Sequence, residues 1–338
     1  MKADKIIDDL KKQQFKPVYW LEGEEEFFID EVMEYAEKHI LKEEEAGFNL
    51  TIFYGRDASW PDVMNACRRY PMFADKQVVL IKEAQGMKDI DRLESYIEKP
   101  LSSTILVVSY KNKKVDGRTK LSKLLKEKGA LLTTKKLYDS ELPEWTQSII
   151  KSKGYTISSK ALILLIDHIG NDLSRLNNEI NKVIINLEKR KSITEDDIEK
   201  YVGISKEYNV FELQQAIAHK DLYKAIRIIQ YFEANPKAAP LPLLFPALYN
   251  YFSKVLMITS IPAHDEKSLA ASVGISPFFI KDYLNTARKY STKGLEQVLL
   301  LLHAYNLKSI GVHDAGTDDM LLLKEMVVKM VHTDSQPF

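Results

Sequence analysis

Short runs of apolar residues, many of them β-branched, alternate with amphipathic segments along the first 140 residues of the chain. The clearest run is residues 78–81, four consecutive apolar residues with polar neighbours on both sides. A run of this length without alternation is typical of a strand that is buried on both faces, as in the interior of a parallel sheet. Four further runs predict strands, at residues 17–21, 49–55, 103–109 and 130–134.

Amphipathic segments separate these strands and predict helices at residues 1–16, 27–41, 59–70 and 89–98. The third of them begins with Ser59, a residue type that caps helix N-termini, followed by Trp60 and Pro61. Strands that alternate with helices at this spacing predict a parallel, doubly wound sheet. Such sheets bind ligands at the carboxyl ends of their strands.

From Pro143 onward the pattern is helical, and no convincing strand is visible. Helices are expected at residues 142–153, 158–168, 173–189, from Thr194 onward, and over most of 206–333. Prolines within residues 235–242 exclude a helix interior and predict a loop, and residues 333–338 are expected to fray. The predicted fold class is α/β plus all-α, with domains at 1–140, 141–205 and 206–338.

Composition restricts the classes of function. The 338 residues carry 48 basic and 48 acidic side chains, and a net charge of zero argues against a general nucleic-acid coat. The N-terminus lacks the apolar core of a signal peptide, and no apolar run looks long enough to span a bilayer. The single cysteine, Cys67, excludes an internal disulfide. These features predict a cytoplasmic protein without a membrane contact.

The first strand and its turn lie where an α/β ATPase would carry its phosphate-binding loop. Such a loop needs several glycines, a lysine and a hydroxyl group, but only Gly23 is present, and Glu24 and Glu25 follow it. The strand at 78–81 ends in Lys82 and Glu83, although a metal-binding aspartate would be expected first. Both halves of the site therefore indicate a degenerate nucleotide site that does not hydrolyse ATP.

No catalytic or metal-binding constellation is visible in the sequence. The seven histidines are scattered, without the spacing of a zinc-binding pair. The adjacent acids after Gly23 are explained by a helix N-terminus without invoking a metal. We therefore predict no catalytic residues, no metal and no cofactor.

Met72 and Phe73 follow Pro71 in a predicted loop, and two interpretations are open. Large apolar residues in loops usually fold back onto the core. Alternatively, they form an exposed anchor that fills a pocket on another protein.

Basic side chains are densest just after the fourth strand, at the predicted ligand-binding edge of the sheet; they are Lys111, Lys113, Lys114 and Arg118. Contact with DNA phosphates and a solvated helix face are both open interpretations.

Residues 268–276 and 278–284 have the spacing of a helix-turn-helix. A helix that reads DNA should offer Arg, Gln or Asn near its start, whereas this one offers Pro277, Phe278 and Phe279. Packing between helices explains those residues better.

Several segments together resemble the clamp-loader delta subunits of bacterial DNA polymerase III. They are residues 17–25 with 29–31, 71–73 with 77–81, 170–179, 269–274 and 277–288. The resemblance implies an AAA+-like α/β domain at 1–140, a small helical lid at 141–205 and a helical collar for oligomerisation at 206–338. It also implies the absence of a working ATP site.

The resemblance favours the exposed-anchor interpretation. Met72 and Phe73 would enter a pocket on the sliding clamp, and the preceding helix with Arg68 and Arg69 would lean on the clamp beside Pro71. Implied partners are the sliding clamp (beta), the gamma/tau and delta prime subunits through the collar, and primer–template DNA.

The resulting prediction is a subunit that opens the clamp ring for loading onto primed DNA. It would belong to a DNA-directed DNA polymerase (nucleotidyltransferase) holoenzyme without catalysing a reaction itself. The alternatives are an active AAA+ ATPase and a helix-turn-helix DNA-binding regulator.

Overall fold

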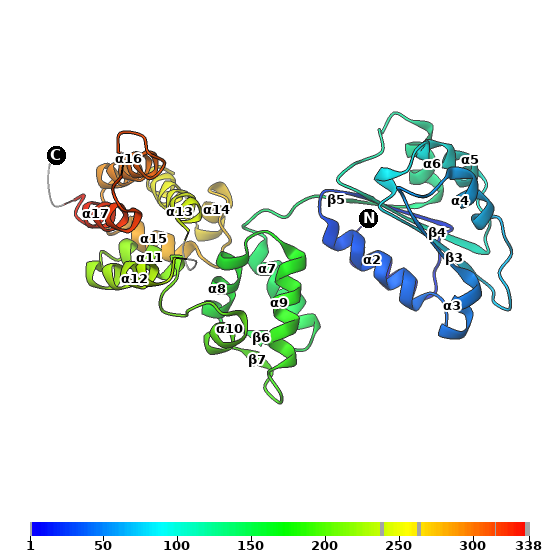
Figure 1. Ribbon diagram of the computed structural model, residues 1–338, viewed down its shortest axis with the longest axis horizontal. Coiled ribbons are helices and arrows are strands. Elements are labelled where there is room, and N and C mark those ends of the chain that lie inside the picture. Colours follow the sequence, from blue (N-terminus) through cyan, green and yellow to red (C-terminus); the bar gives the residue numbers. More distant parts are fainter. Residues whose placement is uncertain (1, 237–239, 262–264, 315, 335–338) are drawn as a thin grey trace. The chain divides into compact units, whose positions relative to one another are not determined.

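A computed structural model of the chain describes residues 2–236, 240–261, 265–314 and 316–334. The chain divides into two compact units, Met1–Leu137 and Tyr138–Phe338, called here the first and the second unit (Figure 1). The sequence predicts three domains, and their boundaries stay predictions. Each unit is described by itself.

A five-stranded parallel sheet forms the centre of the first unit, with the strand order β2-β3-β4-β1-β5 (Figure 1). The strands are β1 (Val18–Gly23), β2 (Leu50–Tyr54), β3 (Gln77–Lys82), β4 (Thr104–Lys111) and β5 (Ala130–Thr134). All five predicted strands and their parallel arrangement are confirmed. The crossover places the carboxyl end of β1 between those of β4 and β5, where Gly23 pairs with Lys111 and Thr134.

Strand β3 is buried on both faces, as its four apolar residues predict. Val78 and Leu80 pack with α1 (Ala3–Lys11) and α2 (Glu26–His39). Val79 and Ile81 belong to the core on the other face, with α4 (Trp60–Cys67), α5 (Glu94–Glu98) and α6 (Lys120–Lys128). Successive residues of a strand point to opposite faces, so a continuous apolar run is needed to serve both cores.

The helices of the first unit differ from the predicted ones in detail. Residues 43–49 form α3 (Glu43–Asn49), a helix that no pattern in the sequence predicts. The predicted helix at 89–98 begins as a 3₁₀ turn, η2 (Ile90–Leu93), before α5, and another 3₁₀ turn, η1 (Ala84–Gly86), follows β3. Ser59 caps α4, since its Oγ accepts a hydrogen bond from the Asp62 N–H.

The second unit begins with α7 (Leu142–Ser152), α8 (Ser159–Ile169), α9 (Leu173–Ile185) and α10 (Glu195–Val202). The prediction that no strand follows Pro143 is wrong. Two short parallel strands, β6 (Thr156–Ile157) and β7 (Ser192–Ile193), pair beside these helices. Each has only two residues, too few to produce a periodic signal in the sequence.

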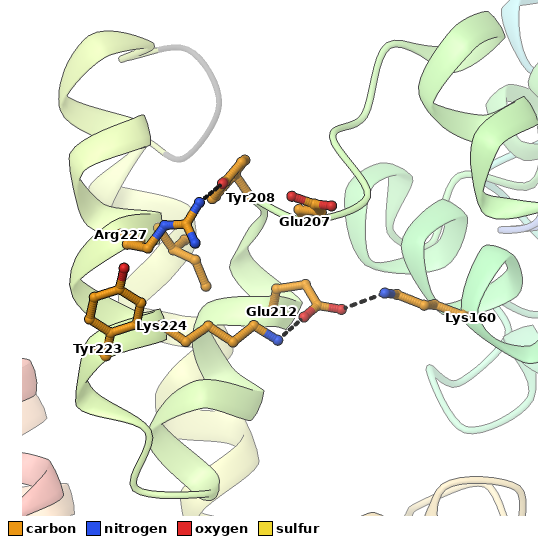
Figure 2. A pocket seen from close by; sticks show the side chains of 8 residues that line it. Lys160, Glu207, Tyr208, Glu212, Tyr223, Lys224 and Arg227 are labelled. Atoms are coloured by element: carbon orange, nitrogen blue, oxygen red, sulfur yellow. Dashed lines mark hydrogen bonds and ion pairs between the residues drawn. The ribbon is translucent and has the colours of Figure 1, made fainter.

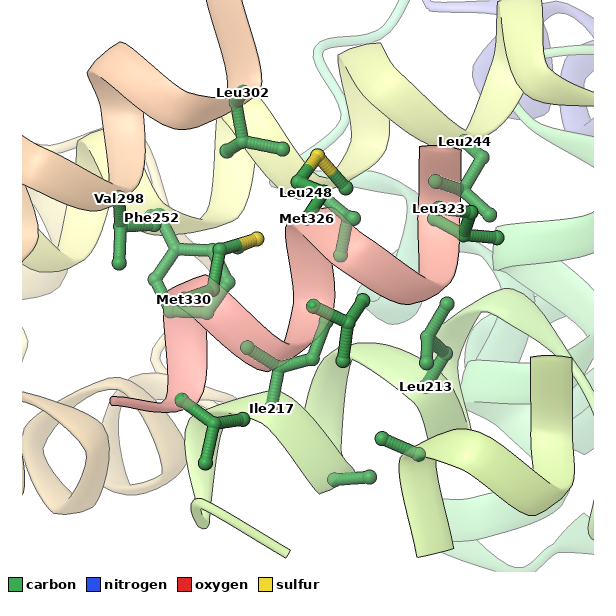
Figure 3. Packing of buried hydrophobic residues seen from close by; sticks show 14 of the residues in the cluster. Leu213, Ile217, Leu244, Leu248, Phe252, Val298, Leu302, Leu323, Met326 and Met330 are labelled. Atoms are coloured by element: carbon green, nitrogen blue, oxygen red, sulfur yellow. The ribbon is translucent and has the colours of Figure 1, made fainter. Parts of the chain in front are cut away.

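The rest of the second unit is helical. Its helices are α11 (Val210–Ala218), α12 (Leu222–Ala234), α13 (Leu241–Ser260), α14 (Glu266–Ser272), α15 (Ile280–Ala287), α16 (Thr292–Ser309) and α17 (Asp319–Val331). Figure 3 shows the core that α11, α12, α13, α16 and α17 share, in which Leu248 and Phe252 of α13 lie beside Met326 and Met330 of α17. The predicted loop at 235–242 lies partly outside the described residues. It ends two residues earlier than predicted, because α13 begins at Leu241. Most of the predicted frayed end, 333–338, also lies outside them.

Helix α13 corrects one expectation from composition. By length and hydropathy alone it could cross a membrane, although no apolar run seemed long enough. One such helix is weak support for a membrane span, because the core helix of a soluble protein passes the same test. Leu244, Leu248 and Val255 of α13 are fully buried in the helical core.

The segment with helix-turn-helix spacing forms α14 and α15. Gly274 lies in the turn with a positive φ of 65°. Ile275, Phe279 and Ile280 pack with Leu269 of α14 in one apolar cluster. Phe279 thus serves packing, as the sequence favours, whereas Phe278 is 42% exposed and lies outside this cluster.

Candidate functional site

The loop between α4 and β3 is fixed where it leaves the helix. The buried side chain of Gln77 donates from Nε2 to the carbonyl oxygens of Ala66 (3.2 Å) and Arg69 (2.6 Å) and to Oγ1 of Thr104 (2.7 Å). These bonds tie the end of α4 to strands β3 and β4. The loop therefore begins from a rigid part of the sheet.

Met72 and Phe73, called here the apolar tip, point into solvent. Their exposed fractions are 52% and 94%, and the neighbouring Tyr70 is exposed as well. The interpretation in which these residues fold back onto the core is therefore wrong for this chain. Phe73 also has a φ of 55°, a left-handed conformation that is unfavourable for a bulky residue.

A second element holds the apolar tip. Asn49, the last residue of α3, is only 2% exposed and forms hydrogen bonds with both the N–H and the C=O of Met72, at 2.7 and 2.9 Å. Arg69 donates to Thr51 Oγ1 at 3.0 Å, and Arg68 is exposed beside it. Asn49 is distant in sequence, and no pattern around it predicts this role.

The predicted degenerate nucleotide site lies at the carboxyl end of β1. Gly23 has a φ of +123°, and a Cβ atom built on it would lie 2.2 Å from the carbonyl oxygen of Thr134. The N–H of Gly23 donates to the Lys113 carbonyl oxygen at 3.1 Å. This glycine is thus needed for close contact between backbones within the sheet, independently of any phosphate.

The glutamates after Gly23 contact cations of the protein. Glu25 is buried, accepts a hydrogen bond from the Phe27 N–H at 3.3 Å at the start of α2, and pairs with Lys136 at 3.3 Å. Glu24 lies 3.8 Å from Lys114. A triphosphate at this turn would meet negative charge instead of free backbone donors.

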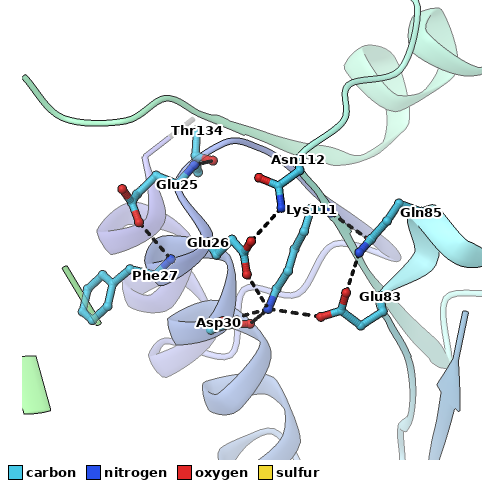
Figure 4. Close-up of polar contacts among 9 residues, drawn as sticks. All are labelled: Glu25, Glu26, Phe27, Asp30, Glu83, Gln85, Lys111, Asn112 and Thr134. Atoms are coloured by element: carbon cyan, nitrogen blue, oxygen red, sulfur yellow. Dashed lines mark hydrogen bonds and ion pairs between the residues drawn. The ribbon is translucent and has the colours of Figure 1, made fainter. Parts of the chain in front are cut away.

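Lys111 at the end of β4 is the central cation of the site. Its ammonium group lies 2.8 Å from Asp30, 3.3 Å from Glu83 and 3.4 Å from Glu26, and its side chain is 11% exposed (Figure 4). Lys82, the cation that the sequence placed in the site, instead pairs with Glu37 at 2.6 Å. The geometry also argues against the predicted contact of Lys111 with DNA phosphate, because its ammonium group is enclosed by carboxylates.

The surroundings of Lys111 favour the protonated, charged form of its amine. Burial, the largest influence, lowers the pKa of the amine, but the hydrogen bond to Asp30 and the charges of Asp30, Glu83 and Glu26 together outweigh it and raise the pKa. The resulting stabilisation is complete below the ordinary lysine pKa of about 10.4 and is lost only as pH rises through the raised value. The ion cluster is thus intact at neutral pH.

We expect the chain to show no saturable binding of Mg·ATP at concentrations up to about 1 mM. The ammonium group of Lys111 is already paired with three carboxylates. Phosphates would need hydrogen-bond donors that are free of such partners. Equilibrium dialysis with labelled ATP measures this directly. Stoichiometric binding would contradict the degenerate site.

Replacement of Lys111 by methionine should lower the free energy of unfolding by about 1–2 kcal/mol. The variant keeps the apolar stem but leaves three carboxylates facing one another without a counter-charge. Urea unfolding measures the effect. Lys120→Met is the matched control, because Lys120 also pairs with two carboxylates but is well exposed, so we expect little change. Equal losses in both variants would contradict the central role of Lys111.

The other basic residues predicted to contact DNA phosphates are less enclosed by carboxylates than Lys111. Lys113 lies 3.4 Å from the Gln85 carbonyl oxygen, Lys114 contacts Glu24, and Arg118 is 92% exposed with Asp116 at 3.1 Å. A DNA phosphate could displace such exposed partners at low cost.

A small cavity of about 300 Å³ in the second unit collects charged and aromatic side chains (Figure 2). Glu212 of α11 is buried and pairs with Lys160 of α8, at 3.2 Å, and with Lys224 of α12. Arg227 donates to the Tyr208 hydroxyl at 2.7 Å. These contacts satisfy one another and join three helices, so the cavity needs no ligand to explain its charges. Within the described ranges, no group of three or more acidic, histidine or cysteine side chains is placed to hold a metal ion.

Comparisons with known proteins agree over most of the chain. Residues 19–135 match the family described as DNA polymerase III, delta subunit, and residues 207–334 match the family's C-terminal domain. DNA polymerase III subunit delta of Bacillus subtilis is 27% identical, with coverage of 95% of this chain and 94% of that protein. A probable DNA polymerase III subunit delta of Aquifex aeolicus is 23% identical, with coverage of 86% and 85%.

Among solved structures, the Bacillus subtilis DNA clamp loader delta protein matches with a TM-score of 0.54 at 24% identity, over 97% of this chain and 99% of that one. This likeness supports the fold. The two family matches lead to one conclusion: the chain belongs to the DNA polymerase III delta-subunit family.

Proposed function

We propose that this chain binds the sliding clamp through Met72 and Phe73 and opens the ring for loading onto primed DNA. The observation that carries the proposal is the apolar tip itself, two large apolar side chains exposed on a loop whose backbone is fixed by side chains of the sheet and of α3. An exposed, rigid apolar anchor is typical of the energetic centre of a protein interface.

The chain can supply work only as binding energy. Burial of a methionine and a phenylalanine side chain contributes a few kcal/mol, about 1.5–3 for each if fully buried. A ligand shifts a conformational equilibrium only by its preference for one state, so the tip must bind the open ring better than the closed one. Arg68, Arg69 and Pro71 flank the tip and would contact the clamp surface around its pocket.

Membership in the family supports the remaining partners that we propose. The second unit would join the gamma/tau and delta prime subunits through its helical part, the proposed collar, where several apolar side chains are exposed; they include Leu243, Leu300, Ile310 and Leu321. Lys113, Lys114 and Arg118 would contact primer–template DNA through phosphates, without sequence preference. This role corresponds to a cytoplasmic location, and it requires no nucleotide, metal or catalytic group in this chain.

Release of the clamp from nicked circular DNA tests the proposal. The clamp from the same organism is loaded, the isolated chain is added without ATP, and the clamp remaining on DNA is followed by gel filtration. We expect release that grows with the concentration of the chain. A chain that binds the clamp but never accelerates its release would contradict ring opening, and one that does not bind would contradict the whole proposal.

A further inference from the structure

The apolar tip has a conformation that the loop would not adopt by itself. Phe73 combines a positive φ of 55° with almost complete exposure to solvent. A left-handed backbone is unfavourable for a bulky residue, and an exposed phenylalanine gains no burial to offset that strain. Contacts elsewhere must therefore fix this backbone.

Asn49 makes the contacts that do so. Its Nδ2 donates to the Met72 carbonyl oxygen at 2.9 Å and to the Glu45 carbonyl oxygen at 3.0 Å, and its Oδ1 accepts from the Met72 N–H at 2.7 Å. One buried amide thus pairs with the backbone of Met72 on both sides, as a neighbouring strand would. The side chain itself is enclosed and offers no surface to a partner.

We propose that Asn49 is a positioning residue for clamp binding, holding Met72 and Phe73 in the conformation that enters the clamp. This inference rests on the proposed function. A loop that samples several conformations binds more weakly, because its apparent affinity falls with the fraction that is competent to bind. Asn49 therefore raises affinity by removing an ordering cost, without touching the clamp.

The main test is Asn49→Ala in the full chain. We expect its affinity for the clamp to fall about tenfold or more, and hydrogen exchange at the Met72 amide to accelerate. Asn49→Leu, which fills more of the buried volume but pairs with neither backbone group, should behave alike and serves if the alanine variant folds poorly. Asn186→Ala is the control for loss of the bond along the helix alone, since the exposed Asn186 also donates to the carbonyl oxygen four residues earlier, at 2.7 Å to Lys182.

A double-variant cycle separates positioning from general destabilisation. In a Met72→Ala/Phe73→Ala background, Asn49→Ala should weaken clamp binding no further, because the side chains that it positions are gone. An equal loss in both backgrounds, or parent-like binding and exchange of Asn49→Ala, would overturn the role of Asn49. Failure of the parent to bind the clamp would overturn the proposed function, while exchange at Met72 would still report whether Asn49 fixes the loop.

Discussion

Replacement of Met72 and Phe73 by alanine is expected to weaken binding of the chain to the sliding clamp by about 3 kcal/mol or more, which is over a hundredfold in Kd. Both side chains are exposed in the free chain, so their burial in a pocket removes apolar surface from water without first breaking contacts in the core. Surface plasmon resonance with immobilised clamp measures the loss. Thermal unfolding should be nearly unchanged.

The matched control is Met257→Ala/Phe278→Ala. These residues are of the same two types, are 46% and 42% exposed, and belong to the second unit. We expect the control to bind the clamp as the parent does. Equal losses in both double variants would indicate a general effect of apolar surface, and parent-like binding of the Met72→Ala/Phe73→Ala chain would place the contact elsewhere.

The two side chains should also differ. Phe73 is almost fully exposed, whereas Met72 is about half covered, so Phe73→Ala alone should cost more affinity than Met72→Ala alone. The same binding measurement on the two single variants ranks them. A dominant contribution from Met72 would contradict this ranking by exposure.

The sheet of the first unit could be predicted from local pattern because each strand carries its own signal. Residues 78–81 must serve the cores on both faces, and this requirement leaves a run without polar residues. Elements with weaker signals were missed. Strands β6 and β7 have two residues each, and α3 has only Asn49 buried among its seven residues. None of the three elements therefore shows a periodic pattern of apolar residues.

The predicted degenerate nucleotide site illustrates which contacts a sequence pattern reveals and which appear only in the folded chain. The missing loop residues were visible because a phosphate-binding loop is contiguous in sequence. The identity of the central cation was not, because Lys111 and Asp30 lie 81 positions apart in the sequence and meet only in the folded chain. Lys82 ends the expected strand but turns to Glu37, a choice that depends on the packing of α2 against the sheet.

The exposure of the apolar tip could likewise not be predicted from the sequence. The sequence identified Met72 and Phe73 as unusual for a loop but left open whether they are buried. Their exposure depends on where the loop leaves the sheet, which Asn49 and Gln77 fix from other elements. Residues that bind a partner can thus be noticed locally, while the residues that hold them in place become visible only in three dimensions.

Replacement of Gly23 by alanine is expected to lower the free energy of unfolding of the first unit by about 3 kcal/mol or more. The alanine backbone would have to keep a φ of +123°. Its methyl group would lie 2.2 Å from the carbonyl oxygen of Thr134, which is a backbone atom and cannot move aside as a flexible side chain could. Relief would require β1 and β5 to separate at their carboxyl ends, with loss of the bond from the Glu25 N–H to Thr134 Oγ1.

Urea unfolding followed by tryptophan fluorescence measures this effect on the correct unit. In a Trp145→Phe background the remaining tryptophans, Trp20 and Trp60, both report on the first unit. Gly47→Ala is the matched control, because Gly47 lies in α3 with no atom near the new methyl group, and the exchange should be neutral or stabilising by up to about 1 kcal/mol. Similar stability of the two variants would mean that Gly23 is not required by the sheet. A large loss confined to Gly23→Ala would show that the sheet itself requires a glycine at this turn, independently of any phosphate.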